Sequence, residues 1–465
     1  MNNIQTLADA IIENQVEQVI AYLRYGADLN AVDEYGFTPL IEAAIADNYQ
    51  LAKLLIDHGA NVKLQDMTGG TALHWAAENN NIELTKLLLE NGADPNAYTF
   101  AGQPVLVMPL LRQQQTLKKL LVKYKANIEF AQDYINAKLL GHMFELVGTA
   151  DIIDLKNNFV EIDFEGFYLE FSLAIIAEAL DQFKNHFAAR ELRRYTQFST
   201  IIVETINRAA RLIKFQQYRV DTKKYITDIN HLFQQEPLLI PIGYEGHAIT
   251  FIKMGNILVK CDRREDSRLY DNVMFYHVGR LEQLTEKFIY QLIYEKQSGD
   301  FINTELHKIL DLQPITQIKV AAQISGNCSW ANVEACIPAI FFLLFSQYQD
   351  FQENMSRYKN IALNYFQKWR EWNKDRALNF CIQRFKEADS LRKACKGELL
   401  AAILYQSCHE NNPDDMNRIE SILEVLNTTQ YKYILQNYVK TYCYEDMSEE
   451  GVRFLQMLKN HGYQT

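Results

Sequence analysis

A period of 33 residues runs through the first part of the chain and restricts what that part can fold into. One short motif recurs at this interval, as Gly26-Ala27-Asp28, Gly59-Ala60-Asn61, Gly92-Ala93-Asp94 and Lys125-Ala126-Asn127. A second motif keeps the same interval, as Thr38-Pro39-Leu40, Thr71-Ala72-Leu73-His74 and a degraded Gln103-Pro104-Val105-Leu106. Such a period is typical of a solenoid, whose repeats must stack because one repeat buries too little apolar surface alone.

The residue types in these motifs predict a pair of short helices in each repeat. A threonine such as Thr38 caps the free amide groups at a helix start. Pro39 fits the first helical position, where no amide donor is needed. The glycines of the first motif can adopt the left-handed conformation that ends a helix. Together these motifs resemble ankyrin repeats, with three repeats and the remains of a fourth over about residues 3–145.

The ankyrin resemblance implies a protein-binding surface on the concave side of the solenoid, formed by the hairpin tips and the inner helices. Exposed residues outside the repeat consensus are the best candidates for partner contact, namely Tyr35, Phe37 and Phe100. Consensus residues such as His74 hold the repeat together and indicate nothing about the partner. The expected partner is therefore another protein.

Composition limits the other classes of function. A chain of 465 residues suggests about three domains, and a net charge of -11 argues against direct nucleic-acid binding. The seven cysteines contain no Cys-x-x-Cys pair, so neither a disulfide framework nor a zinc ribbon is indicated. We expect no metal and no cofactor. The longest apolar run, 335–345, is shorter than the roughly 20 residues of a membrane span.

Beyond about residue 150 the 33-residue period disappears, and the spacing of apolar residues changes twice. Residues 166–234 have helical spacing of apolar residues, whereas strand-like runs begin at Leu238. The last part of the chain, from residue 348, has helical spacing throughout, and its first two helices are expected over 351–372 and 374–393. The sequence therefore predicts an α+β multidomain protein with an ankyrin solenoid (1–147), a central α+β domain (148–346) and a helical C-terminal cap (347–465).

Two strand-like runs flank Gly255 and Asn256 and predict a β-hairpin. A two-residue loop at this position pairs residues whose numbers sum to 511, so Asp262 lies opposite Ile249. His247 shares a face with Ile249, because side chains alternate along a strand. Asp262 then becomes a diagonal neighbour of His247, about 7–8 Å away at the backbone. A carboxylate there could hold the imidazole in one tautomer.

A cysteine, Cys328, precedes a segment with helical spacing and is a candidate nucleophile. A helix start and a nearby histidine both lower the pKa of a thiol. Gly326 permits a sharp turn before it, and the side chain of Gln323 could donate to an oxyanion. A single cysteine is more often a small buried residue, and His277 is a rival base. The hairpin, Gln323 and Cys328 occur together. A catalytic role for Cys328 is therefore as strong a hypothesis as a role in packing.

The order of these residues resembles the clan of thiol proteases that includes the adenovirus and ubiquitin-like-protein proteases. In that clan a histidine, an acid, a glutamine and a cysteine follow in this order, and bacterial acetyltransferase effectors share it. The resemblance covers about residues 238–346 and implies that His247, Asp262, Gln323 and Cys328 form the catalytic set. Two departures exist. The glutamine is one residue closer to the cysteine than is usual, and Pro338 would kink the following helix.

The complete arrangement is similar to ankyrin-repeat effectors that intracellular bacteria inject into host cells. It implies type IV secretion and action in the host cytosol or nucleus on a host substrate. Three hypotheses stay open at this point: a thiol hydrolase, an acyltransferase that uses the same cysteine, and a non-catalytic ankyrin scaffold with a vestigial thiol-protease fold.

Overall fold

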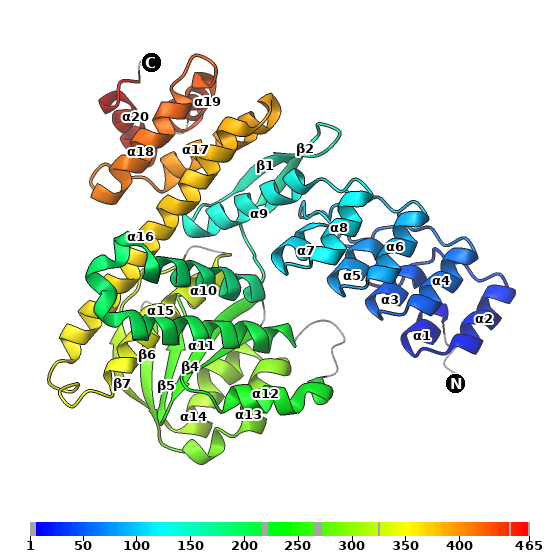
Figure 1. Ribbon diagram of the computed structural model, residues 1–465, viewed down its shortest axis with the longest axis horizontal. Helices are drawn as coiled ribbons and strands as arrows, with labels where there is room; N and C mark the ends of the chain where they lie inside the picture. The colour runs from blue at the N-terminus through cyan, green and yellow to red at the C-terminus, as the bar shows by residue number, and fades with distance from the viewer. Residues whose placement is uncertain are drawn as a thin grey trace. The chain divides into compact units, whose positions relative to one another are not determined.

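The computed structural model describes residues 6–215, 222–244, 246–263, 272–323, 326–445 and 448–463, and Figure 1 traces them from the N-terminus to the C-terminus. Contacts divide the chain into two compact units. Unit 1 comprises Met1–Lys138, Thr149–Asp163 and Asp389–Cys395, and unit 2 comprises Leu139–Gly148, Phe164–Ala388 and Lys396–Thr465.

Unit 1 contains the repeats as antiparallel helix pairs, which confirms the ankyrin prediction. The pairs are α1 (Leu7–Ile12) and α2 (Val16–Arg24), α3 (Pro39–Ile45) and α4 (Tyr49–Asp57), α5 (Ala72–Glu78) and α6 (Ile82–Glu90), and α7 (Val107–Leu111) and α8 (Gln115–Lys123). Thr38 caps α3 by accepting from the Ile41 amide at 3.2 Å. Gly59 has the predicted left-handed conformation after α4, with a φ of 96°. Repeat motifs and local geometry therefore agree.

A β-hairpin that the sequence analysis did not predict completes unit 1. It consists of β1 (Thr149–Ile153) and β2 (Phe159–Asp163), paired antiparallel. The Asp154 carboxylate closes its turn by accepting from the amides of Lys156 at 2.7 Å and Asn158 at 2.8 Å. The tip of the third repeat packs on β2, since a Cβ at Gly102 would lie 3.1 Å from the Glu161 carbonyl oxygen. The long helix α9 (Ile128–Met143) precedes this hairpin.

Unit 2 is built on a five-stranded antiparallel sheet. Its strands follow one another in chain order: β3 (Leu238–Tyr244), β4 (His247–Met254), β5 (Ile257–Cys261), β6 (Val273–Val278) and β7 (Leu312–Ile318). Met254 pairs with Ile257 and Thr250 with Cys261, which confirms the predicted loop and register. When the same register is continued by one residue, Asp262 lies opposite Ile249.

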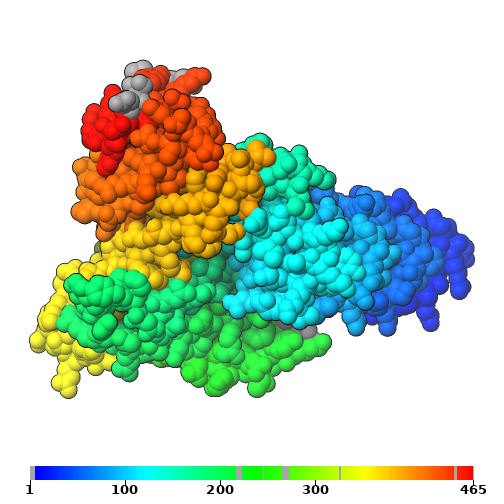
Figure 2. Space-filling view, turned by 45° about the horizontal axis from the view of Figure 1, so that its top comes forward, coloured from blue at the N-terminus to red at the C-terminus, as the bar shows by residue number. Residues whose placement is uncertain are grey.

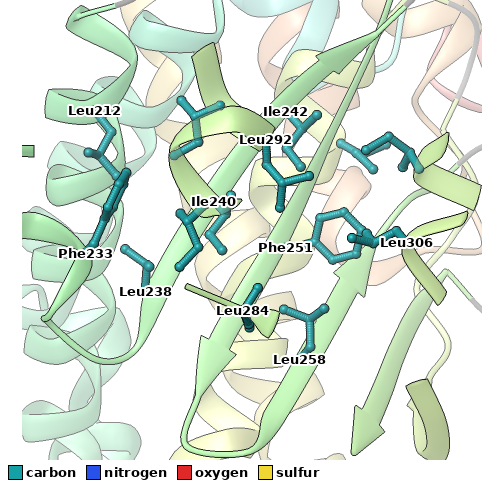
Figure 3. Close-up of a cluster of buried hydrophobic side chains, with 14 of the residues drawn as sticks. Leu212, Phe233, Leu238, Ile240, Ile242, Phe251, Leu258, Leu284, Leu292 and Leu306 are labelled. Atoms are coloured by element: carbon teal, nitrogen blue, oxygen red, sulfur yellow. The ribbon is translucent and has the colours of Figure 1, made fainter. Parts of the chain in front are cut away.

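Helices cover both faces of this sheet. One face packs on α12 (Ile226–Phe233), α13 (Glu286–Tyr294) and α14 (Leu306–Leu310), and Figure 3 shows Phe251 and Leu258 of the sheet among the side chains between these layers. The other face packs on α15 (Cys328–Phe345), which α10 (Leu169–Asn185) and α11 (Thr196–Lys214) cover in turn, as Figure 1 shows. Three short segments, η1 (Phe187–Tyr195), η2 (Thr222–Tyr225) and η5 (Phe301–Glu305), connect these elements.

Among the described residues, α15 is the one helix long and apolar enough to cross a membrane. However, 94% of its apolar window is buried inside the protein. Its apolar character is explained by contacts on all sides, because the sheet, α10, α11 and α16 (Met355–Glu387) all pack on it. Pro338 lies inside α15 without ending it.

The C-terminal part is helical, as predicted, and its surface runs from yellow to red in Figure 2. They are α16, α17 (Ser390–Gln406), α18 (Pro413–Leu426), α19 (Lys432–Tyr438), η6 (Val439–Glu445) and α20 (Glu449–Asn460). One detail of the prediction is wrong. We expected separate helices over 351–372 and 374–393, whereas α16 continues through Asn373, which is buried and neither a glycine nor a proline.

Replacing Phe251, which is 1% exposed in the core of unit 2, tests this packing. We expect Phe251→Ala to lower the free energy of unfolding of unit 2 by about 3–5 kcal/mol, because it removes buried contacts and leaves a cavity. Guanidinium denaturation followed by circular dichroism measures the change. Phe380→Ala, at a position that is 49% exposed, is the control and should change the value by less than about 0.5 kcal/mol. Equal effects would contradict the packing.

Candidate active site

Cys328 is the first residue of α15, as the sequence predicts. Gly326 makes the turn before it with a φ of 73°, and a Cβ there would lie 2.4 Å from Cγ of Glu165. The carbonyl oxygen of Gly326 accepts from the Gly166 amide at 3.0 Å, which fixes the turn. Cys328 is partly exposed, whereas the other six cysteines are buried. The start of a helix favours a thiolate, because its free amide groups point towards the sulfur.

His247 and Asp262 face each other across the hairpin. His247 begins β4, Asp262 directly follows β5, and the distance from His247 Nε2 to Asp262 Oδ1 is 3.0 Å. The second carboxylate oxygen, Oδ2, lies 3.4 Å from Nζ of Lys260. Lys260 also donates to the Asn303 side chain at 2.6 Å. The imidazole is therefore held by a carboxylate that is itself fixed by a cation.

The thiol of Cys328 contacts the start of β4. The Ala248 amide donates to Cys328 Sγ at 3.4 Å, and Ala248 directly follows His247 in β4. Burial raises the pKa of Cys328, but the hydrogen bond and charge of His247 and the Ala248 amide outweigh it, so the pKa is lowered overall. By contrast, burial raises the pKa of Cys408 to about 12 and also raises that of Cys261.

Gln323 precedes Cys328 in the chain, but the hydrogen bonds of Gln323 do not define a role for it. Its main-chain amide donates to the Arg263 carbonyl oxygen at 2.8 Å. Its side chain is buried, and Oε1 has no hydrogen-bond partner among the described residues. An oxyanion role for Gln323 stays a prediction.

One supporting residue, Asn332, was missed by the sequence analysis. Its Nδ2 donates to the Ala248 carbonyl oxygen at 2.6 Å, and its Oδ1 accepts from the Arg263 amide at 2.7 Å. It therefore ties the first turns of α15 to both strands of the hairpin. A signal was present in the sequence, because Asn332 is a polar residue four positions after Cys328 in an otherwise apolar helix.

The structure separates the rival base, His277, from this site. His277 is exposed and pairs with Ile257, at the end of β5 opposite to Asp262. His74 caps its own repeat with Thr71 and lies 3.4 Å from the Gln103 carbonyl oxygen, and burial lowers its pKa to about 4. Among the described residues, no group of three or more His, Cys, Asp or Glu side chains could hold a metal ion.

The predicted partner-binding residues lie near a groove within unit 1. The groove has a volume of about 730 Å³ and is lined by the tips of the second and third repeats and by the β1–β2 hairpin, including Tyr98, Phe100 and Phe159. Phe100 is 72% exposed, and Tyr35 is 60% exposed on the neighbouring tip. Phe37 is half-buried instead, with its ring edge-on to Trp75 at 6.1 Å between ring centroids.

The lowered pKa of Cys328 predicts selective alkylation. We expect iodoacetamide at pH 6 to modify Cys328 in the folded protein well before the other six cysteines, because only the thiolate reacts. Since the folded pKa lies below the ordinary value, reactivity should persist below about pH 8.5 and disappear as the pH falls through the folded pKa. Peptide mass spectrometry measures the modification.

Two controls accompany this measurement. His247→Asn should raise the pKa of Cys328 and slow its alkylation at pH 6 by about tenfold or more, because the imidazole no longer stabilises the thiolate. Unfolding in urea should remove the selectivity of Cys328. Equal rates for all cysteines in the folded protein would contradict the arrangement.

Comparisons with known proteins agree with the ankyrin repeats and with the architecture of the whole chain. A family model of ankyrin repeats, in three copies, matches residues 7–99. No curated protein sequence matches the chain. The solved structure of the Legionella effector AnkH matches with a TM-score of 0.85 and 39% sequence identity, over 99% of this chain and 98% of that one. The chain therefore belongs to the family of the Legionella effector AnkH.

Proposed function

We propose that the chain is a bacterial effector that binds a host protein through its ankyrin unit and acts on a host substrate with a Cys328–His247–Asp262 thiol site. One observation carries the catalytic part. A partly exposed thiol at a helix start accepts a hydrogen bond from the start of β4, at Ala248, next to an imidazole whose Nε2 lies 3.0 Å from a carboxylate. The relationship to an effector supports action in a host cell.

The chemistry of such a site is acyl transfer through a thioester. The Cys328 thiolate attacks an amide or thioester carbonyl carbon, and the carbonyl electron pair moves to oxygen. His247 gives its proton to the leaving group as the C–N or C–S bond breaks. Asp262 stabilises the imidazolium. Water, deprotonated by His247, then attacks the acyl-enzyme, releases the acid and restores the thiolate.

Two alternatives share parts of this arrangement. An acyltransferase would form the same thioester but pass the acyl group to a host amine or hydroxyl. A non-catalytic scaffold would use the ankyrin groove alone, and the independent formation of that groove within unit 1 favours it as the second candidate. Detection of the acyl-enzyme, and of the nucleophile that resolves it, distinguishes the three.

Substitutions at the thiol site test the catalytic proposal. Against a panel of fluorogenic peptide amides and thioesters, Cys328→Ala should abolish turnover. His247→Ala and Asp262→Asn should lower kcat/KM by about 10²–10⁴-fold, because proton transfer is lost or misdirected. His277→Ala is the matched control and should leave kcat/KM unchanged. Turnover that survives Cys328→Ala would refute the site.

Cross-linking tests the binding part of the proposal. A photoreactive phenylalanine analogue at Phe100 or Tyr35 should cross-link a host protein, whereas the same analogue at Phe380 in unit 2 should not. With that host protein purified, Phe100→Ala should weaken its binding by about 5–30-fold, the cost expected for an aromatic contact residue. Unchanged affinity would remove Phe100 from the binding surface.

A further inference from the structure

Arg263 directly follows Asp262 and is 0% exposed. Its main chain is held on both sides: the amide donates to Asn332 Oδ1 at 2.7 Å, and the carbonyl oxygen accepts from the Gln323 amide at 2.8 Å. Asn332 belongs to the Cys328 helix, and Gln323 to the segment before it. The backbone of Arg263 therefore connects the end of the hairpin, where Asp262 lies, to the Cys328 helix and to the segment before that helix.

The guanidinium of Arg263 also bonds to the segment before Cys328 and to the Cys328 helix. Nε donates to the Ala321 carbonyl oxygen at 2.6 Å, and Nη1 to that of Ala331 at 3.4 Å. Nη2 donates to Glu145 Oε1 at 3.0 Å. A planar guanidinium presents donors in fixed directions, so one side chain can set the spacing of three segments, which a lysine ammonium cannot do.

Four charged side chains lie near this position, of which Glu334 is buried and the other three are partly buried. Glu145 accepts from Arg263 and also lies 2.8 Å from Arg370. Glu334 lies 3.6 Å from Arg263 and 3.7 Å from Arg370. Lys374 adds a further positive charge near Glu145. The two arginines thus share the same two carboxylates, and Arg263 in addition holds the segments of the thiol site.

The end of α9 and the residues that follow it also support the site. Glu145 lies two residues after α9, and the Asn327 side chain, next to Cys328, donates to the carbonyl oxygen of His142 in the last turn of α9 at 3.2 Å. The rings of His142 and Trp330 are stacked, 6.4 Å apart between centroids. Residues 142–145 therefore contact both the turn before Cys328 and the arginine after Asp262.

We infer that Arg263 is a positioning residue of the thiol site, which sets Asp262 and the 321–323 segment relative to Cys328 with Glu145 as its fixed counterion. The inference rests on the proposed function. In this role Arg263 aligns the Asp262 carboxylate with His247 and thereby stabilises the thiolate–imidazolium pair. Arg263 itself does not contact the substrate.

The pH profile of Cys328 alkylation in the full chain tests this role, because a merely structural contribution would not change it. Arg263→Lys keeps the charge but loses the fixed donor directions. We expect the apparent pKa of Cys328 to rise by about one unit, so that iodoacetamide reacts about tenfold more slowly at pH 6 and equally fast above pH 10. Glu145→Gln should act in the same direction, by about threefold.

Arg370→Lys is the matched control, since it changes the partner of the same two carboxylates, and its rate at pH 6 should stay within about twofold of the wild type. A folded Arg263→Lys variant with the wild-type profile would overturn the inference, as would an equal shift in Arg370→Lys. If circular dichroism shows that Arg263→Lys does not fold, an unchanged profile in Glu145→Gln overturns it. An ordinary pKa for Cys328 in the wild type would refute the proposed function and this inference together, whereas unchanged variants refute the inference alone.

Discussion

The antiparallel register of β4 and β5 decides which side chains the thiol site contains. Because strand side chains alternate, a shift of one residue would move Asp262 to the opposite face from His247. The pairing of Thr250 with Cys261 prevents this shift. Buried residues fix the register on both faces, since Phe251 packs in the core of Figure 3 while Thr250 lies against Cys336 of α15.

The second requirement is that α15 presents its first residue to that hairpin. A helix surrounded by the sheet and other helices must be apolar on all sides, so each polar residue within it needs a partner. Asn332 and Glu334 are 1% and 2% exposed, and both are engaged with groups near the site. The polar residues of this core helix therefore mark where it is attached to the hairpin.

The sequence predicts features that depend on local spacing and fails where distant segments meet. The repeats, the hairpin turn and the helix start at Cys328 follow from periodicity and from residue types a few positions apart. Arg263 and Glu145 are 118 residues apart in the chain, and no local pattern joins them. The expected boundary between 372 and 374 is absent, because α16 continues through Asn373, which packs inside the protein.

The pKa of each cysteine thiol in this chain depends on where the residue lies in the fold. Burial alone raises the pKa of a thiol, which explains the direction of the shift for Cys261 and Cys408. Cys328 is also partly buried, yet the His247 side chain and the Ala248 amide reverse the direction of its shift. Both partners come from the first two residues of β4. The reactivity of the thiol therefore depends on where one strand begins, and on the contacts of Asn332 and Arg263 that hold its surroundings in place.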